Sequence, residues 1–348
     1  MNEVVTGNAA VDGAATLDEI ELPLPDRRAG KVRVSYEWSA TERLFVTTDR
    51  LSAFDRIIAT VPHKGQVLNQ LSAWWFDRTR SIVANHLVSV PDPNVTIGRT
   101  AHPLSVEVVV RGYITGVTST SLWKQYADGA RTIYGYELPD GLVKNTALAA
   151  AIVTPTTKAD AGAHDQPITC TEVVDRGLVA APLWARVCDR ALALFEVGQT
   201  VAESAGLILA DTKYEFGLAA DDGELLLIDE AHTPDSSRYW MADTYAERID
   251  RGDEPESLDK EVVRLALIEL GYDGAGPVPT LPPHVIAATA ARYVAAYERI
   301  TALPFVAAAT PAALRIQRAV AALASSPPTS RPADTPPVDI PPTAQDPA

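Results

Sequence analysis

The sequence predicts an α+β fold of two domains. Three short runs of alternating hydrophobicity, 31–36, 43–48 and 57–61, follow one another and are typical of an antiparallel meander. Apolar residues recur at helical spacing in 66–83, 185–205 and 284–301, whereas 106–110 and 225–228 are apolar runs typical of buried strands. A chain of 348 residues is long enough for two ordinary domains.

Shifts in composition suggest where these domains begin and end. The segment 1–21 begins with small and acidic residues, which predicts a flexible leader. We place an N-terminal domain at 22–107 and a larger domain at 108–303. A C-terminal extension follows at 304–324. Residues 325–348 are rich in proline, serine and threonine, so they cannot bury enough apolar area to offset their conformational entropy. We expect this tail to be disordered.

Composition also excludes several classes of protein. A net charge of −15 disfavours nucleic acid and anionic membranes as partners. No apolar run approaches twenty residues and the start lacks a secretory signal, so we expect a cytoplasmic protein and no membrane partner. Cys170 and Cys188 belong to no CxxC or Cys/His cluster, which argues against a disulfide framework or a zinc site. The sequence leaves open whether copies of the chain associate.

The segment 209–240 is the most informative part of the chain. Strand alternation places Asp211, Lys213 and Glu215 on one face of an extended segment. The apolar run 225–228 ends at Asp229, whose carboxylate can meet Glu215 across the strand pair. A solvated surface is the competing interpretation, but the charges lie in apolar sequence and precede a polar loop that ends in Arg238. Two carboxylates beside a lysine indicate Mg²⁺ and phosphate, and arginine suits a phosphate or carboxylate.

A second candidate site lies near the N-terminus. Lys31 and Arg33 are two residues apart on a predicted strand and therefore share a face. They follow Gly30, which allows a phosphate to approach backbone N–H groups. The segment is not a P-loop, because GxxxxGK[ST] is absent.

Two further segments have the composition of ligand-binding loops. Arg111 follows a buried strand and is soon followed by Ser119 and Ser121, which indicates either a monophosphate pocket or an ordinary loop with hydroxyl groups. The segment 154–165, which includes Lys158 and Asp165, is typical of a substrate loop.

Nine segments occur in an order that resembles one known family. They are GKVR, TDRLSAFD, HKGQVLNQLSAWWF, EVVVRGYITG, TSLWKQY, LPDGL, TPTTKADAGAHD, LADTKYEFG and IDEAHTPDSSRYW. Together they resemble the phosphoribosylaminoimidazole-succinocarboxamide synthases, or SAICAR synthetases, over about residues 30–303. The resemblance covers most of the chain.

The resemblance implies a fold and an activity. The family has a smaller antiparallel N-terminal domain similar to the N-lobe of protein kinases and a larger α+β domain, with ATP in the cleft. By this resemblance, 22–107 binds ATP, and 108–303 binds substrate and metal. The implied reaction joins L-aspartate to the carboxylate of carboxyaminoimidazole ribonucleotide (CAIR) through an acyl phosphate. It uses ATP and Mg²⁺, and it yields SAICAR, ADP and phosphate in de novo purine synthesis.

The resemblance also implies roles for individual residues. Lys31 and Arg33 contact the ATP phosphates, and a hinge at 106–108, including Glu107 and Val108, reads the adenine edge. The implied metal ligands are Glu215 and Asp229.

The remaining implied roles concern the substrate. The residues beside the substrate carboxylate, with a catalytic role, are Asp211, Lys213 and Arg238. The residues that bind the ribonucleotide phosphate are Arg111, Ser119 and Ser121. Lys158 and the loop to Asp165 close over the substrate.

Some positions depart from the family pattern. Val34 stands where an acidic residue is common, His232 is unexpected, and the loop 116–123 is longer than in compact members. These departures leave open a paralogous ATP-dependent amide ligase that acts on a related nucleotide-like carboxylate in a specialised nucleoside natural-product pathway. A non-catalytic nucleotide-binding protein is a third hypothesis.

Overall fold

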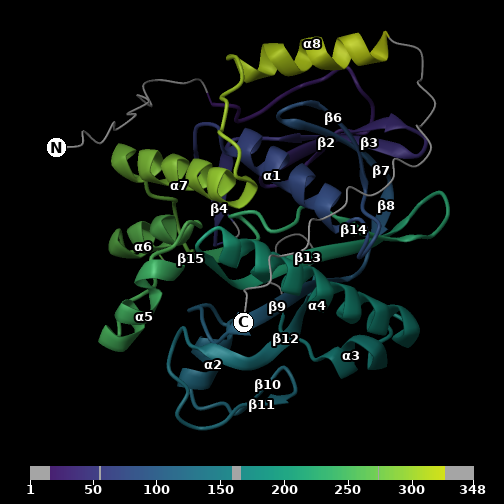
Figure 1. Ribbon diagram of the computed structural model, residues 1–348. Helices are drawn as coiled ribbons and strands as arrows, with labels where there is room; N and C mark the ends of the chain where they lie inside the picture. The colour runs from purple at the N-terminus through teal and green to yellow at the C-terminus, as the bar shows by residue number, and fades with distance from the viewer. Residues whose placement is uncertain (1–15, 55, 159–165, 273, 326–348) are drawn as a thin grey trace, which may run out of the picture.

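The computed structural model describes residues 16–54, 56–158, 166–272 and 274–325 (Figure 1). The tail expected at 325–348 lies outside these ranges except for Ser325, as does the leader up to residue 15. The rest of the leader differs from the prediction, because Leu17 and Ile20 are each only 3% exposed. The backbone N–H of Leu17 donates to Asp49, and the carbonyl of Ile20 accepts from Tyr36. These contacts pack residues 16–21 against the N-terminal sheet.

The N-terminal part of the chain forms a five-stranded antiparallel sheet in the order β1-β2-β3-β7-β6. Its strands are β1 (Arg28–Ala29), β2 (Arg33–Ser39), β3 (Glu42–Thr47), β7 (Val95–Arg99) and β6 (Leu87–Asp92). The strand predicted at 57–61 is present as β5 (Arg56–Thr60), but its place in the meander is wrong, because β5 pairs with β4 (Arg50–Ala53) in a separate two-stranded sheet. Leu51 at this sheet packs into a different hydrophobic cluster, with Val263 and Leu267. The chain therefore leaves the first sheet after β3.

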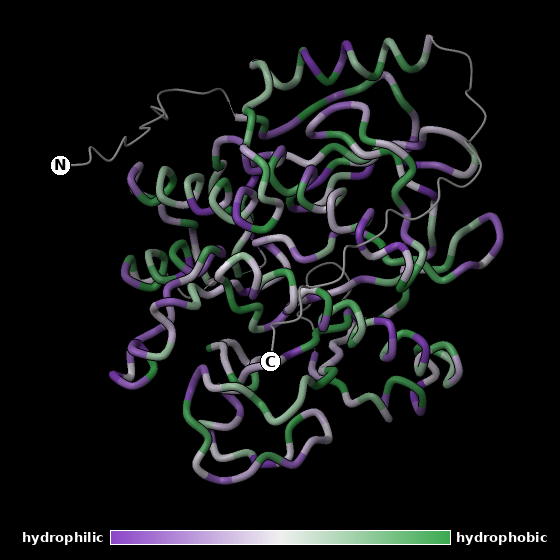
Figure 2. The backbone as a smooth tube through the Cα atoms, viewed as in Figure 1, coloured by the Kyte–Doolittle hydropathy of each residue, from purple (hydrophilic) through white to green (hydrophobic). Residues whose placement is uncertain are grey.

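Two helices flank the N-terminal sheet. Helix α1 (Lys64–Thr79) contacts β3, and α8 (Ala312–Ala324) lies along the sheet at the top of Figure 1. Figure 2 shows that α8 alternates between hydrophobic and hydrophilic residues. Its apolar residues Ile316 and Val320 are buried against Leu17, Ile20 and the sheet. The C-terminal extension thus completes the hydrophobic core of the N-terminal part.

A six-stranded sheet forms the centre of the molecule, in the order β12-β9-β13-β14 with β15 and β8 also paired to β13. The strands are β12 (Ala147–Thr157), β9 (Val106–Tyr113), β13 (Leu207–Ala219), β14 (Leu225–Ile228), β15 (Ser237–Met241) and β8 (Ala101–Pro103). Because β13 is 13 residues long, it pairs with four different strands along its length. It therefore carries charged residues into the middle of the structure.

The hinge expected at 106–108 is not a connector between sheets. Glu107 and Val108 lie inside β9, opposite Thr156 and Pro155 of β12, and Val108 also lies opposite Tyr214 of β13. Strand β9 is continuous through the expected boundary at 107/108. Val108 lies between β12 and β13, whereas Val106 and Glu107 are paired with β12 alone.

Helices cover the central sheet and enclose its core (Figure 1). Helix α4 (Ala181–Ser204) packs on β13, β9 and β12, and Phe195 and Trp184 join the main hydrophobic cluster. The other elements are α2 (Leu122–Ala127), β10 (Thr132–Ile133), β11 (Tyr136–Glu137), α3 (Cys170–Asp175), α5 (Ala242–Arg251), α6 (Glu261–Glu269) and α7 (Pro283–Thr301). Within the described residues, no helix has the length and apolar character needed to cross a membrane.

Candidate active site

The alternation predicted for β13 places a lysine among three carboxylates. The Lys213 ammonium lies 2.6 Å from Glu107 of β9 and 3.2 Å from Glu215 two residues along its own strand. Burial opposes the charge on Lys213, but Glu215, Glu107 and Asp229 outweigh it and raise the pKa of the lysine. Lys213 is therefore a fixed positive charge at neutral pH.

Arg33 joins the N-terminal sheet to the end of β14. Its guanidinium is paired with Asp229 and lies 2.9 Å from Glu230. Asp229 has a φ of 68°, in the left-handed region, where the chain turns directly after β14. Although burial opposes it, the charges of Arg33 and Lys213 hold the pKa of Asp229 below its usual value. Asp229 is therefore an ionised carboxylate.

Glu215 and Asp229 have the chemistry of a magnesium site. Both act electrostatically on Lys213, and Glu215 also pairs with Lys158 from the end of β12. Among the described residues, no three His, Cys, Asp or Glu side chains are grouped closely enough to hold a metal by themselves. Mg²⁺ is usually bound through one or two carboxylates together with substrate phosphates. This donor pair fits such an ion.

A second cluster centres on Asp211, which is 6% exposed. Its Oδ2 accepts from Arg111 at 3.1 Å and from Arg238 of β15. Arg111 also donates to the Thr154 hydroxyl at 2.8 Å and to the Thr120 carbonyl at 3.2 Å. Arg111 is thus held by protein groups on three sides, whereas the Arg238 side chain is 20% exposed.

The two serines expected at the phosphate site have different surroundings. Ser121 is buried, and its hydroxyl donates to the Thr118 carbonyl at 2.6 Å. It lies beside Gly116, where an added Cβ would come within 2.5 Å of the Ser121 Cβ and 3.5 Å of an Arg238 nitrogen. The loop therefore brings Ser121 and Arg238 together. Ser119 is exposed and takes no part in this cluster.

Two other expected residues are placed differently or not described. Lys31 lies in the bend before β2 and not on the strand, because β2 begins at Arg33. The prediction that Lys31 and Arg33 share a strand face is therefore wrong. The substrate loop predicted at 154–165 is wrong in its first part, because residues 154–157 belong to β12; Lys158 follows that strand, and residues 159–165, including Asp165, lie outside the described residues.

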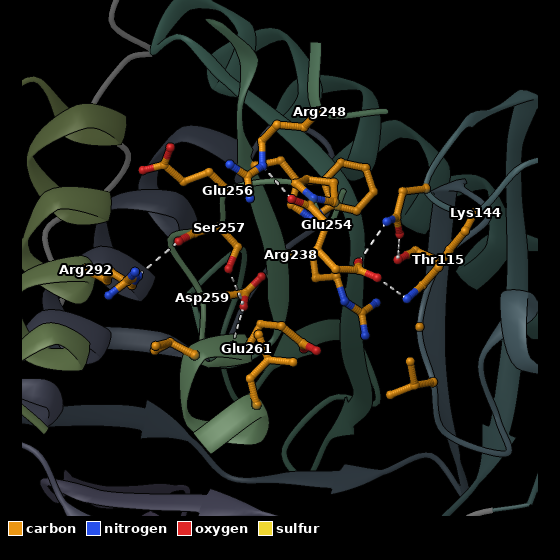
Figure 3. A pocket seen from close by; sticks show the side chains of 17 residues that line it. Thr115, Lys144, Arg238, Arg248, Glu254, Glu256, Ser257, Asp259, Glu261 and Arg292 are labelled. Atoms are coloured by element: carbon orange, nitrogen blue, oxygen red, sulfur yellow. Dashed lines mark hydrogen bonds and ion pairs between the residues drawn. The ribbon is translucent and has the colours of Figure 1, made fainter. Parts of the chain in front are cut away.

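Arg238 also forms part of the wall of a cavity of about 280 Å³ (Figure 3). Figure 3 shows Arg238 between Asp259 and Glu261 on one side and Thr115 and Lys144 on the other. Sequence reasoning missed Lys144, Asp259 and Glu261. Asp259 lies two residues before α6 and accepts from the backbone N–H of Glu261, the first residue of that helix, at 2.7 Å, a contact typical of the start of a helix. No sequence signal therefore separates it from a structural residue.

Comparisons with known proteins identify the family. A family model described as SAICAR synthetase matches residues 26–278. The chain belongs to the SAICAR synthetase family. It is 48% identical over 291 residues to a putative phosphoribosylaminoimidazole-succinocarboxamide synthase 2 of Agrobacterium fabrum, covering 83% of this chain and 92% of that protein. A synthase of Legionella pneumophila is 49% identical over 295 residues, with the same coverage of 83% and 92%.

A solved structure gives the same result. The SAICAR synthase from Saccharomyces cerevisiae in complex with SAICAR has a TM-score of 0.72 and 33% identity, covering 84% of this chain and 100% of that one. The predicted family resemblance and α+β fold are confirmed.

The two unexpected residues of this family member are both buried. Val34 is 0% exposed and packs with Leu44 and Val46 in the core of the N-terminal sheet. His232 is also 0% exposed, and its ring lies 4.5 Å from that of Trp75. Both departures therefore concern packing.

Proposed function

We infer that the chain is an ATP-dependent ligase that joins L-aspartate to the carboxylate of CAIR, giving SAICAR, ADP and phosphate in purine biosynthesis. Family membership supports this activity. The observation that carries it is the meeting of Lys213 and Glu215 from β13 with Arg33 and Asp229 at the end of β14. Phosphoryl transfer requires positioning and charge neutralisation above all, and these four side chains supply both signs of charge.

We place ATP between the N-terminal sheet, the middle of β13 and the end of β14. Arg33 reaches from β2 to Asp229, so it lies where phosphates would meet the carboxylates. Glu215 and Asp229 would hold Mg²⁺, which neutralises phosphate charge when it is bound. One related structure, a SAICAR synthetase of 23% identity, is a complex with ADP. Lys31 remains a proposed phosphate contact from the bend before β2.

The residues suggest how the reaction proceeds. A CAIR carboxylate oxygen attacks the γ-phosphorus, the bond to the ADP oxygen breaks, and an acyl phosphate results. The aspartate amine then attacks the acyl carbon, releasing phosphate and a proton. Lys213 faces the developing negative charge as a fixed cation, and Asp211 orients Arg238 toward the substrate. No serine or cysteine nucleophile is needed.

We assign the ribonucleotide phosphate to Arg238 and the buried Ser121. Arg238 is partly exposed and lines the cavity of about 280 Å³, which has room for a ribonucleotide portion. Arg111 donates to Asp211, Thr154 and Thr120, so we propose that it supports this site from behind. This changes the role that the resemblance implied for Arg111.

The specialised paralogue is less well supported than SAICAR synthesis. Val34 and His232 are buried core residues, so neither alters a group that faces ligand. We also propose that the protein acts in the cytoplasm on these small-molecule substrates.

One assay tests the proposed function. The purified protein is incubated with CAIR, L-aspartate, ATP and Mg²⁺, and the succinocarboxamide product is measured by mass. Product at enzymatic turnover supports the proposal. Turnover of ATP only with another carboxylate would instead favour the specialised ligase, and ATP binding without turnover would favour a non-catalytic protein.

A further inference from the structure

The fold brings the two cysteines of the chain together. Cys170 is the first residue of α3, and Cys188 lies in α4, which packs against α3. Both are free thiols, both are partly exposed, and both pack against the main hydrophobic cluster. The two thiols are hydrogen-bonded to each other. The sequence contains no CxxC motif, so this contact depends entirely on how α3 packs on α4.

Polar groups gather around the sulfur of Cys170. Its thiol donates to the carbonyl of Val153 in β12, with the sulfur 3.8 Å from the oxygen. The indole N–H of Trp184, one turn before Cys188 in α4, is buried and forms no hydrogen bond with the described residues. Trp184 and Tyr136 both lie where they can donate to a Cys170 thiolate. The surroundings therefore suit a negatively charged sulfur.

These surroundings make the two thiols unequal. The hydrogen bond from Cys188, together with Trp184 and Tyr136, holds the pKa of the Cys170 thiol below its usual value although burial opposes it. The hydrogen bond to Cys170, burial and the charge of Cys170 raise the pKa of the Cys188 thiol. Since the thiolate is the nucleophilic form of cysteine, Cys170 is the more reactive of the two. The effects of Cys170 on Cys188 end once the Cys170 thiolate has reacted.

The donor set favours oxidation over metal binding. Within the part of the chain that the structure describes, no third His, Cys, Asp or Glu joins the two cysteines to form a metal-binding group, whereas zinc usually takes four ligands. An accessible cysteine of low pKa next to a second cysteine is the arrangement that reacts with peroxides. We propose that Cys170 and Cys188 form a reversible disulfide on reaction with a peroxide, with Cys170 attacking first and Cys188 resolving the intermediate.

Two steps give the disulfide. The Cys170 thiolate attacks one oxygen of hydrogen peroxide, the O–O bond breaks, and hydroxide leaves and takes up a proton to become water. A sulfenic acid remains on Cys170. The sulfur of Cys188 then attacks the sulfur of Cys170, the S–O bond breaks, and the hydroxide leaves with the thiol proton as a second water. The two sulfurs together lose two electrons, which reduce the peroxide, and a dithiol reductant restores both thiols.

Peptide mapping tests the proposal directly. Trypsin cleaves after Arg176 and Arg186, so the two cysteines fall on the separate peptides 159–176 and 187–190. The reduced, folded protein is treated with an equimolar amount of hydrogen peroxide, the remaining thiols are blocked, and the digest is analysed by mass spectrometry. The two peptides should appear linked and lighter by two hydrogen atoms than their sum. Dithiothreitol should separate them.

Two cysteine variants assign the order of attack. Cys188→Ser keeps a donor beside Cys170, so peroxide should leave a sulfenic acid on Cys170 that dimedone traps. Cys170→Ser should lower the rate of dimedone labelling at least about tenfold relative to Cys188→Ser, because the remaining thiol lacks the donors that favour a thiolate. Equal labelling of the two variants would contradict the assigned roles.

A tyrosine variant and the unfolded chain test the role of the fold. Tyr136→Phe should slow disulfide formation about fivefold, since one hydrogen bond to the thiolate is lost, whereas the matched control Tyr297→Phe in α7 should not. The same reaction in urea should be slower and should show no preference between the two sulfurs. The proposal is overturned if both thiols of folded wild type stay free, if the link joins two different chains, or if the unfolded chain reacts as fast as the folded one. These measurements follow the cysteines alone, so their outcome does not depend on whether the protein makes SAICAR.

Discussion

At the scale of single residues, the site is a set of charges that neutralise one another. Lys213 lies between Glu107 and Glu215, and Arg33 pairs with Asp229. Each of the two proposed metal ligands, Glu215 and Asp229, is therefore already paired with a cationic side chain of the protein. Such pairing positions both carboxylates and, for Asp229, holds the pKa below its usual value, so their removal is a change of charge more than of packing.

Replacing a proposed metal ligand should remove activity without unfolding the protein. Glu215→Gln and Asp229→Asn should each lower kcat by at least about a hundredfold, since metal ions supply several kcal/mol of transition-state stabilisation. Melting temperature should change little. Titration with Mg²⁺ in the product assay checks the cause, and Asp128→Asn at the exposed residue directly after α2 is the control. Near-normal kcat in either variant would exclude that residue from the metal site.

The two arginines on Asp211 should behave differently. Arg238→Met should raise the KM for CAIR by about ten- to a hundredfold, since a charged donor to phosphate contributes about 1.5–3 kcal/mol. Both variants remove one donor to Asp211, but Arg111→Met should lower the melting temperature more, because Arg111 also donates to the buried Thr154 hydroxyl and to the Thr120 carbonyl. Equal effects of the two variants on both quantities would contradict this division of roles.

At the scale of elements, α8 closes the N-terminal core from the far end of the chain. Ile316 on the buried face of α8 is 0% exposed, and Arg315 of the same helix pairs with Asp92 at the end of β6. The helix therefore links the C-terminal extension to the sheet that we assign to ATP.

Truncating the buried face of α8 should destabilise the protein. Ile316→Ala should cost about 2–5 kcal/mol of unfolding free energy, the usual cost of removing a large buried aliphatic side chain. Leu314→Ala on the same helix is the control, because Leu314 is 50% exposed. Urea unfolding of both variants measures the difference. Equal stability would show that α8 contributes little to the core.

At the scale of the whole molecule, two buried histidines link stability to pH. Burial lowers the pKa of both His86 and His232 to about 3. Both are neutral when folded, whereas in the unfolded chain a histidine takes up a proton near pH 6.5. The unfolded state therefore binds more protons than the folded state below this pH. The contribution of these histidines to the free energy of unfolding is complete above about pH 6.5 and declines as the pH falls toward 3.

This linkage predicts a measurable acid sensitivity. Each histidine should cost about 1.4 kcal/mol of unfolding free energy per pH unit below about 6.5. Urea unfolding of wild type and His232→Gln at pH 5.0 and 7.5 isolates one of them, and the variant should show the smaller loss on acidification. The same pH dependence in both proteins would contradict the assignment of a neutral buried His232.

The sequence alone determined the features that depend on local backbone geometry. Strand alternation placed Asp211, Lys213 and Glu215 on one face, since successive side chains of a strand point to opposite sides. The apolar run 225–228 coincides with β14, and the helix expected at 284–301 differs from α7 by one residue. These patterns depend only on residues that are close together in the sequence, so they can be recognised without knowing the tertiary structure.

Only the tertiary structure decided which of these elements meet. Arg33 reaches Asp229, 196 residues away, because the N-terminal sheet lies against the end of β14. Strand β5 lies outside the predicted meander and packs against α6, and residues 106–108 form the first part of the central strand β9. Asp259 drew no attention in the sequence, and only the fold places it where its charge acts on Arg238. Local periodicity specifies an element and its buried face, but strand order and loop packing, which depend on residues far apart in the chain, determine which charges share a site.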